Sequence, residues 1–333
     1  MVQRTANFLQ LPIRVRAAAL AVTLAAIVIV QPACESSTAP VTNKDPESAR
    51  LVFDDLPRFW RAFDEIHSFA DTMPLRRHYL DSATAGLAEF TSLRWKNSTT
   101  LTSAVWARRN YYASIRPTTL GLSQTIQSDV RTAMRSFAQL YPDAVFPDVY
   151  FCLGAMATSG TIGQHGLFIG VELFTDGATS PHSELSPWQS SVIRPPSLLP
   201  AIVAHEVTHY QQKVHGGTLL AQSILEGSAD FVSELVTGMT VNAPIHEYGN
   251  AHEMELWNEF KQAMNGSDVS QWLYNGGSVT STSRPADLGY FIGYQITKAY
   301  WGAHADKSAS LRDILTVTNF PAFLAASAYA GTS

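Results

Sequence analysis

The run His205-Glu206-Val207-Thr208-His209 is the centre around which this 333-residue chain is organised. In an α-helix, residues four positions apart lie one turn apart on nearly the same face. His205 and His209 can therefore direct two imidazole nitrogens at one metal ion, while Glu206 stays on the same side and can reach a metal-bound water. An apolar segment, residues 201–204, precedes the run, which indicates a buried helix. The spacing predicts a zinc site with two ligands and a base.

A catalytic zinc ion takes three protein ligands and keeps one position open, so a third ligand must come from elsewhere. Glu226 opens the run Glu226-Gly227-Ser228-Ala229-Asp230 and follows His209 by enough residues to end one helix, turn and return with another. We expect Glu226 to be the third ligand. Asp230 lies one helical turn further on. It can accept the free ring N–H of a zinc-bound histidine and so fix its tautomer.

A second ligand set competes with this one. His215 has the spacing of the third ligand in the H-E-x-x-H-x-x-G-x-x-H pattern. That pattern needs a glycine where this chain has Gln212, which favours helix. We expect the helix to continue to His215 and to stop at Gly216-Gly217, which would turn His215 away from the metal. Glu226 is therefore preferred, with His215 as the alternative.

These motifs resemble the gluzincin arrangement of zinc peptidases. The wider sequence resembles predicted zinc-dependent peptidases related to a gliding-motility lipoprotein family of bacteria. The matching segments are residues 166–172, 204–212, 226–231 and 288–294. The resemblance extends from about Tyr141 to the C-terminus. It implies an exported or anchored zinc metallopeptidase, with no defined substrate to carry over.

The expected fold is α+β and mostly helical. It has a zincin-like metallopeptidase core of two zinc-ligand helices and a small sheet with an edge strand by the cleft. In the resembling peptidases, a strand upstream of the zinc helix lines the cleft and pairs with extended substrate. Residues 167–174 are β-rich and can serve so by strand addition, or form an ordinary hairpin. The glycine-rich segment 154–166 is expected to be a connecting loop.

Helical patterns cover most of the remaining chain. Residues 49–141 predict a helical N-terminal lobe, and residues 142–333 the zinc-site region of the same metallopeptidase-like domain. The predicted helices are 57–67, 75–93, 101–115, 122–141, 200–215, 219–237, 248–264 and 287–301. Residues 175–197 contain several prolines and predict a loop over the site. The aromatic residues of the lobe are interpreted as core, without a chemical role.

Three further residues are candidates for stabilising the reaction's oxyanion. In gluzincins, a tyrosine or histidine after the glutamate ligand donates a hydrogen bond to the tetrahedral oxyanion. The resemblance thus implicates Tyr290, Tyr294 and His252, with the two tyrosines preferred. Each tyrosine can instead be a packed aromatic residue. Arg284 and His165 could also reach the cleft, although loop residues of these types are usually solvated.

The N-terminus predicts export. Residues 1–33 carry three arginines followed by the apolar run 17–30, which is too short to span a bilayer and typical of a signal peptide. Ala33 and Cys34 resemble a bacterial lipoprotein cleavage site, although Gln31 departs from the family pattern. We expect lipid attachment at Cys34, with plain cleavage and release as the alternative. Residues 34–48 are polar and proline-containing and predict a flexible tether.

Composition limits the remaining possibilities. The chain is 46% hydrophobic and 15% charged, and it is long enough to bury a large core. Its net charge is -5 without a basic stripe, which argues against nucleic acid as a partner. Cys152, the only other cysteine, lies in an apolar strand-like run and is expected to be a buried core residue. The expected partners are a peptide or protein substrate and a membrane bound through the lipid anchor.

Two functions remain open. In the first, zinc lowers the pKa of its water, Glu206 takes the proton as hydroxide attacks a peptide carbonyl, and Glu206 then protonates the leaving amine. In the second, the chain is a non-catalytic envelope or assembly lipoprotein on a peptidase-like fold with a structural metal. Glu206 discriminates between them, because a purely structural zinc needs no acidic residue beside an open coordination position.

Overall fold

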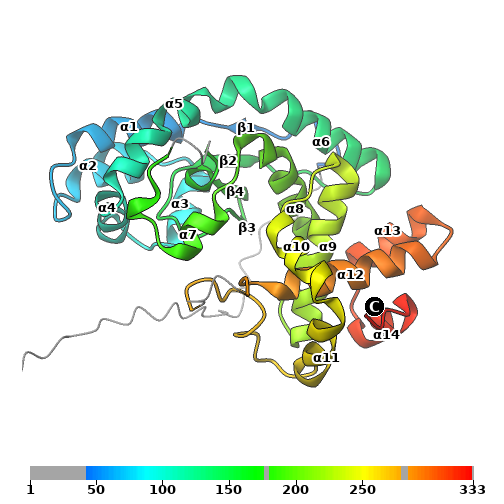
Figure 1. The fold of residues 1–333 in the computed structure, drawn as a ribbon. Coiled ribbons are helices and arrows are strands. Elements are labelled where there is room, and N and C mark those ends of the chain that lie inside the picture. Colours follow the sequence, from blue (N-terminus) through cyan, green and yellow to red (C-terminus); the bar gives the residue numbers. More distant parts are fainter. Residues whose placement is uncertain (1–42, 176–179, 279–283, 332–333) are drawn as a thin grey trace, which may run out of the picture. The chain divides into compact units, whose positions relative to one another are not determined.

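The computed structural model describes residues 43–175, 180–278 and 284–331 (Figure 1). These residues belong to one compact unit, while the leader and Cys34 lie outside the described residues. The prediction of a tether is corrected only for residues 43–48, because the side-chain amide of Asn43 donates to the Phe146 carbonyl at 3.0 Å, whereas residues 34–42 lie outside the described residues. Residues 43–48 thus pack on the domain. None of the described helices is long and apolar enough to cross a bilayer.

Helices fill the N-terminal region, as the sequence predicts, but with different bounds. They are α1 (Asp55–Glu65), α2 (Met73–Leu75), a π-helical turn (Arg76–Leu80), α3 (Ala85–Leu93), α4 (Ser98–Trp106), α5 (Arg109–Thr125) and α6 (Gln127–Leu140). The single helix predicted over 75–93 is wrong. The chain turns before Thr84, whose hydroxyl accepts a hydrogen bond from the Leu87 amide and caps the start of α3.

A four-stranded sheet lies beside these helices. Its strands are β1 (Leu51–Val52), β2 (Val149–Cys152), β3 (Gly160–Gly163) and β4 (Gly166–Gly170), in the order β1-β2-β4-β3. The first three in this order run parallel, and β3 runs antiparallel to β4. Because β1 comes from the N-terminal region, the predicted lobe 49–141 shares its sheet with the rest of the domain. The α+β, mostly helical class is confirmed.

The position of β4 corrects the predicted edge strand. Residues 166–170 pair on both sides and are buried, and the chain then enters a 3₁₀ turn at Val171–Leu173. The free edge belongs instead to β3, within the segment expected to be a loop. Its glycines explain the error, since glycine is unfavourable in strands and gives no alternating pattern.

Two helices carry the candidate ligands. Helix α8 (Leu199–Gln211) contacts β3 and β4 on one side and α9 (Leu219–Thr237) on the other (Figure 1). Helix α9 has the predicted bounds, with Gly238 in the left-handed conformation as its cap. Helix α8, however, ends four residues earlier than predicted, because Gln212 adopts an extended conformation.

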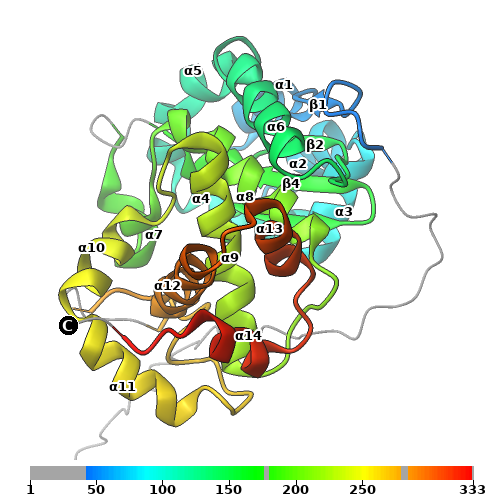
Figure 2. The same cartoon turned by 90° about the vertical axis from the view of Figure 1, so that its right-hand side faces the viewer.

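The C-terminal part packs against α9. It comprises α10 (Ala243–Ala251), α11 (Glu253–Ala263), α12 (Leu288–Ala303), α13 (Lys307–Thr316) and α14 (Phe320–Ser327). Helices α13 and α14 lie on the side of α9 away from the sheet (Figure 2). Helix α12 approaches α9 so closely that a Cβ on Gly227 would overlap the backbone of Gly293, and a Cβ on Gly293 would overlap that of Ser223. The predicted helix 248–264 is two helices, with the break at His252.

Residues 180–198, which lead into α8, contain short helical elements, while residues 176–179 of the predicted loop lie outside the described residues. It forms a 3₁₀ turn at His182–Glu184, the short helix α7 (Pro187–Val192) and another 3₁₀ turn at Pro196–Leu198. Ser186 and Gln189 form a reciprocal capping box at the start of α7.

Three buried tyrosines connect the N-terminal helices to the segments just before β3 and just after β4. Tyr79, Tyr112 and Tyr111 donate hydrogen bonds to the backbone carbonyls of Leu153, Gly154 and Glu172, at 2.7, 2.6 and 2.6 Å. These tyrosines are fully buried. They fix the backbone on both sides of the β3–β4 hairpin.

The same segment is held from inside by a buried carboxylate. Glu172 is 1% exposed and accepts hydrogen bonds from the amides of Gly154 (2.9 Å) and Met156 (3.0 Å). Among the described residues it forms no ion pair. Burial raises the pKa of Glu172 to about 7, although the two backbone donors act in the opposite direction.

Candidate metal centre

Helices α8 and α9 bring the three predicted ligands together. The Nε2 atoms of His205 and His209 are 3.0 Å apart, and Glu226 Oε2 lies 3.2 Å from His209 Nε2 and 3.6 Å from His205 Nε2. The i,i+4 spacing places both rings on one face of α8, and the return of the chain in α9 adds the carboxylate. His205, His209 and Glu226 are a group whose ligand atoms can hold one metal ion.

These separations fit a tetrahedral ion. With zinc–nitrogen and zinc–oxygen bonds of about 2.0–2.2 Å, tetrahedral ligand atoms are about 3.3–3.5 Å apart. The three observed separations bracket this value. The donor set of two imidazoles and one carboxylate is also one that zinc enzymes use.

Each candidate ligand is held by a partner on its outer side. His205 Nδ1 donates to Asp230 Oδ1 at 2.8 Å, and the other Asp230 oxygen accepts from the Asn242 amide at 2.7 Å. His209 Nδ1 lies 2.8 Å from Gln212 Oε1. Both Nδ1 atoms are thus hydrogen-bonded outward, which leaves the Nε2 lone pairs to face the common point.

The carboxylate of the candidate ligand Glu226 has a partner too. Tyr274 donates its hydroxyl to Glu226 Oε1 at 2.5 Å, which leaves Oε2 directed at the two histidines. Gln212 is itself fixed, because its amide donates to the Leu225 carbonyl (2.9 Å) and the Ser228 hydroxyl (3.0 Å) on α9. The ligand atoms are therefore preorganised by a second layer of contacts.

The surroundings favour a positive charge between the ligands. Burial opposes charge on the His205 ring, but hydrogen bonds to Asp230 and Glu226 raise its pKa well above the usual range. Burial also opposes ionisation of Glu226, yet the neighbouring His209 and His205 hold its pKa well below the usual range. Three carboxylates, those of Glu206, Glu226 and Asp230, act on these rings. Such a field suits a cation.

Glu206 is buried beside His205, His209 and Glu226, and its carboxylate lacks a hydrogen-bond partner among the described residues. Burial raises its pKa, while His205 and His209 act in the opposite direction. The strand β3 passes so close that a Cβ on Gly160 would overlap the Glu206 side chain. The absence of a side chain at Gly160 thus allows β3 to pack directly against the Glu206 side chain.

The structure separates the three oxyanion candidates. The Tyr290 ring stacks on His205, with centroids 6.4 Å apart and planes 19° apart. Tyr294 points elsewhere, because its hydroxyl pairs with Glu234 at 3.1 Å. His252 Nδ1 is bonded to the Tyr248 carbonyl at 2.9 Å. Of the three, the structure brings only Tyr290 to the cluster.

Other candidates also lie apart from the cluster. His215 is not in the group of potential ligands, although His209 is near enough to contribute, after burial, to lowering its pKa. Arg284 is ion-paired with Glu259 at 2.6 Å. His165 is bonded to Glu89 at the β3–β4 turn, and Cys152 is buried in the core, as predicted.

Sequence reasoning missed three residues near the site. Gln212 was interpreted as an ordinary helix former, although a polar residue three positions after His209 is a reasonable partner for its ring. Tyr274 lies far along the chain from Glu226, in a loop without a motif. Arg94 comes from the N-terminal helices, where no pattern indicated chemistry. The last two could be found only from the fold.

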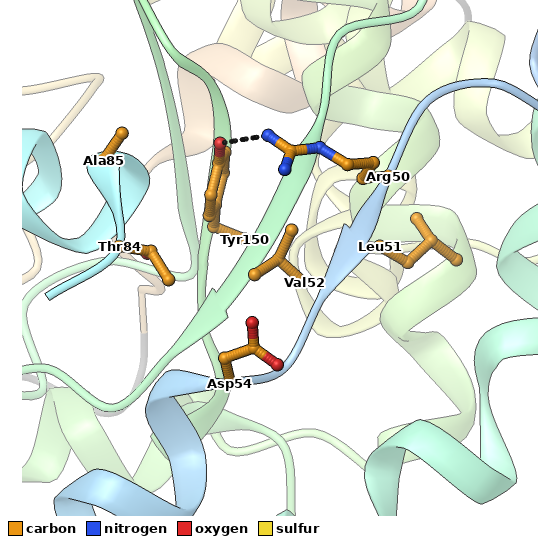
Figure 3. A pocket seen from close by; sticks show the side chains of 7 residues that line it. All are labelled: Arg50, Leu51, Val52, Asp54, Thr84, Ala85 and Tyr150. Carbon is orange, nitrogen blue, oxygen red and sulfur yellow. Dashed lines mark hydrogen bonds between the residues drawn. The ribbon is translucent and has the colours of Figure 1, made fainter.

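A surface pocket elsewhere is not part of this site. It lies at β1 and is lined by Arg50, Leu51, Val52, Asp54, Thr84, Ala85 and Tyr150 (Figure 3). Strand β1 is the edge of the sheet opposite to β3, and no candidate ligand lines the pocket. Arg50 bridges it toward the Tyr150 hydroxyl at 3.3 Å and is also ion-paired with Asp148.

Comparison with known proteins gives a match to a protein family. No curated protein and no solved structure matches the chain. The sequence model of the family described as "Gliding motility protein GldB" matches residues 53–331, which include β2, β3, β4, α8, α9 and the whole candidate metal centre. The chain therefore belongs to the gliding motility protein GldB family.

Proposed function

We propose that this chain is an envelope lipoprotein that hydrolyses peptide bonds with a zinc ion held by His205, His209 and Glu226. The observation that carries the proposal is the convergence of three ligand atoms within 3.0–3.6 Å of one another, beside an uncommitted Glu206. The outward hydrogen bonds of all three ligands support it, because such partners are typical of metal sites. The leader, Cys34 and the family support the envelope location.

Different residues of the chain would perform the separate steps of hydrolysis. A bound zinc ion would supply Lewis acidity and lower the pKa of water toward neutrality. Glu206 lies where it can accept the proton of the attacking water and pass it to the leaving amine. Asp230 and Gln212 hold the two histidine rings in the required tautomer and orientation.

Tyr290 is the proposed donor to the oxyanion. Burial and the charge of Glu226 raise the pKa of its hydroxyl well above the usual range, so the hydroxyl remains a donor at neutral pH. Among the described residues, no hydrogen bond occupies that hydroxyl. A peptide substrate can pair with the free edge of β3, whose Gly160 lies against Glu206.

Metal content and hydrolysis test the proposal. The mature chain with Cys34→Ser is compared with its Glu226→Ala and His215→Ala variants. We expect about one zinc per chain, lost with Glu226→Ala and retained with His215→Ala. Glu206→Gln should keep zinc and lose hydrolysis of a peptide library. Hydrolysis that survives Glu206→Gln in a clean preparation would show that the base is wrongly assigned.

A second candidate function is also compatible with the family. A member of a gliding motility family can be a non-catalytic component that assembles with other envelope proteins and keeps the metal for stability. This alternative predicts a zinc-containing protein that is inert on varied peptides. It also predicts that cells carrying Glu206→Gln match wild-type cells, whereas the peptidase proposal predicts that they match a deletion.

A further inference from the structure

One cation near the candidate metal centre has no carboxylate partner among the residues that the structure describes. Arg94 follows the last residue of α3, and its guanidinium donates to the Thr161 hydroxyl on β3. Thr161 is adjacent to Gly160, the residue that touches Glu206. The hydrogen bond therefore holds the guanidinium beside β3, at the residue that follows the one facing Glu206.

The charge of Arg94 is available to a ligand. Among the ion pairs of residues 43–175, 180–278 and 284–331, none includes Arg94, and the residue is solvent-exposed. Arg50, Arg116 and Arg284 are instead paired with carboxylates.

The electrostatic surroundings of Arg94 support the same conclusion. Although the residue is exposed as a whole, the surrounding protein partly desolvates its guanidinium and lowers the pKa of Arg94, while the site groups Glu206, Tyr290, Tyr274 and Glu226 act in the opposite direction. Arg94 therefore interacts electrostatically with the same groups that would surround a reacting peptide. The two carboxylates among them have other roles, one as a metal ligand and one as the base.

The free edge of β3 provides a path to this cation. Ser159 accepts a hydrogen bond from the Gly170 amide, which makes residues 159 and 170 a hydrogen-bonded pair of the antiparallel ladder. Backbone groups alternate along such a ladder, so those of Gly160 and Ile162 point away from β4. A peptide that pairs with this edge passes both Glu206 and the Arg94 guanidinium.

We propose that Arg94 binds a carboxylate of the peptide substrate close to the bond that is cleaved. A guanidinium offers five donors in a planar fork, and the single bond to Thr161 leaves enough of them for a two-point contact with a carboxylate. The carboxylate is either the C-terminus of the peptide or an acidic side chain. This inference rests on the proposed peptidase function, for which it names the substrate class.

Three tetrapeptide pools with a neutral fluorescent label test the inference. The first has free C-termini, the second has amidated C-termini, and the third is amidated with one fixed glutamate, while all other positions exclude acidic residues. Binding is measured by equilibrium dialysis on the zinc-loaded mature chain carrying Glu206→Gln, which prevents turnover. The same measurement is made after adding Arg94→Gln, Arg94→Lys or Lys96→Gln. Lys96 is the matched control, because it removes one charge from the same segment but bonds only backbone carbonyls of α3.

We expect one carboxylate pool to bind at least tenfold more tightly than the acid-free amidated pool. Arg94→Gln should weaken that pool by roughly 10- to 100-fold, as for other hydrogen bonds to charged groups, and leave the amidated pool unchanged. Arg94→Lys should lose part of the preference, and Lys96→Gln none of it. The pool that responds identifies the source of the carboxylate.

Equal binding of all three pools, no binding of either carboxylate pool, or the same loss with Lys96→Gln as with Arg94→Gln would overturn the inference. Zinc content and cleavage of the pools by the chain with intact Glu206 separate this failure from that of the proposed function. Arg94-dependent binding without cleavage refutes the peptidase and leaves the carboxylate site. Cleavage without a carboxylate preference supports the peptidase and refutes the carboxylate site.

Discussion

The buried carboxylate of Glu172 makes stability depend on pH in an unusual direction. Its pKa rises from an ordinary 4.5 to about 7 in the folded chain. Between these values the folded state holds a proton that the unfolded state has released. The slope of the unfolding free energy with pH is proportional to the number of protons bound by the unfolded state minus the number bound by the folded state. For Glu172 this number is negative between pH 4.5 and about 7. The Glu172 contribution to stability therefore falls as pH rises from about 4.5 to 7 and is constant above.

The size of the effect follows from the shift. Each pKa unit corresponds to about 1.4 kcal/mol, so Glu172 should remove about 3 kcal/mol of unfolding free energy across this range. Glu172→Gln cannot titrate. The difference in unfolding free energy between wild type and this variant should therefore fall by about 3 kcal/mol from pH 4.5 to pH 7.5, whatever other groups contribute.

Urea unfolding followed by tryptophan fluorescence at half-unit pH intervals measures this difference. Glu47→Gln is the matched control, because Glu47 is exposed and forms only a surface ion pair with Arg135, at 3.0 Å. Its difference from wild type should vary by less than about 0.5 kcal/mol. A Glu172→Gln difference as flat as that of the control would refute the reasoning. The carboxylate would then be ionised in the folded state throughout the range.

Four further outcomes are expected. Gly227→Ala should lower the unfolding free energy by about 1–3 kcal/mol, as measured by urea unfolding, because its methyl group meets the backbone of α12. Gly121→Ala, at an open position of α5, should be neutral or stabilise by up to about 1 kcal/mol. Asp230→Asn should weaken zinc binding about 10- to 100-fold, because it removes the carboxylate that orients the ring of His205. A competition titration with a chromogenic chelator measures the affinity. Glu234→Gln on the same helix is the control and should leave the affinity unchanged. Removing zinc with a chelator should lower the melting temperature, since an ion that binds only the folded state stabilises it; an unchanged melting temperature would contradict this.

Local sequence patterns are sufficient to predict those site residues that lie on one helix or on two consecutive helices. The spacing of His205 and His209 predicted two rings on one face, and the return of the chain predicted Glu226 beside them. The bounds of α9 followed from the apolar pattern and from Gly238 as a cap. Asp230, one turn after Glu226, was found for the same reason.

Features that depend on distant pairing were not predictable in this way. Strand β3 lacks strand-forming residues at both ends, because Gly160 must leave room for Glu206, so its role is visible only when α8 is in place. Tyr274 and Arg94 reach the site from separate parts of the fold. Gln212 ends α8 without a glycine, because its side chain has partners on α9 that an extended backbone allows it to reach.

The three buried tyrosines have a consequence for how the protein folds. Tyr79 and Tyr112 come from the N-terminal helices, yet their hydroxyls bond the backbone at residues 153 and 154. If the chain were cut after α6 and the first part removed, these buried carbonyls and the unpaired β1 side of β2 would lose their partners, which is costly in a low-dielectric interior. The two segments must therefore unfold together. Hydrogen exchange should show the amide of Leu153, which donates to the Tyr79 oxygen at 3.0 Å, opening only in the same event as helix α5. Residues 49–141 are thus part of one cooperative folding unit with the candidate metal centre, and not a detachable module.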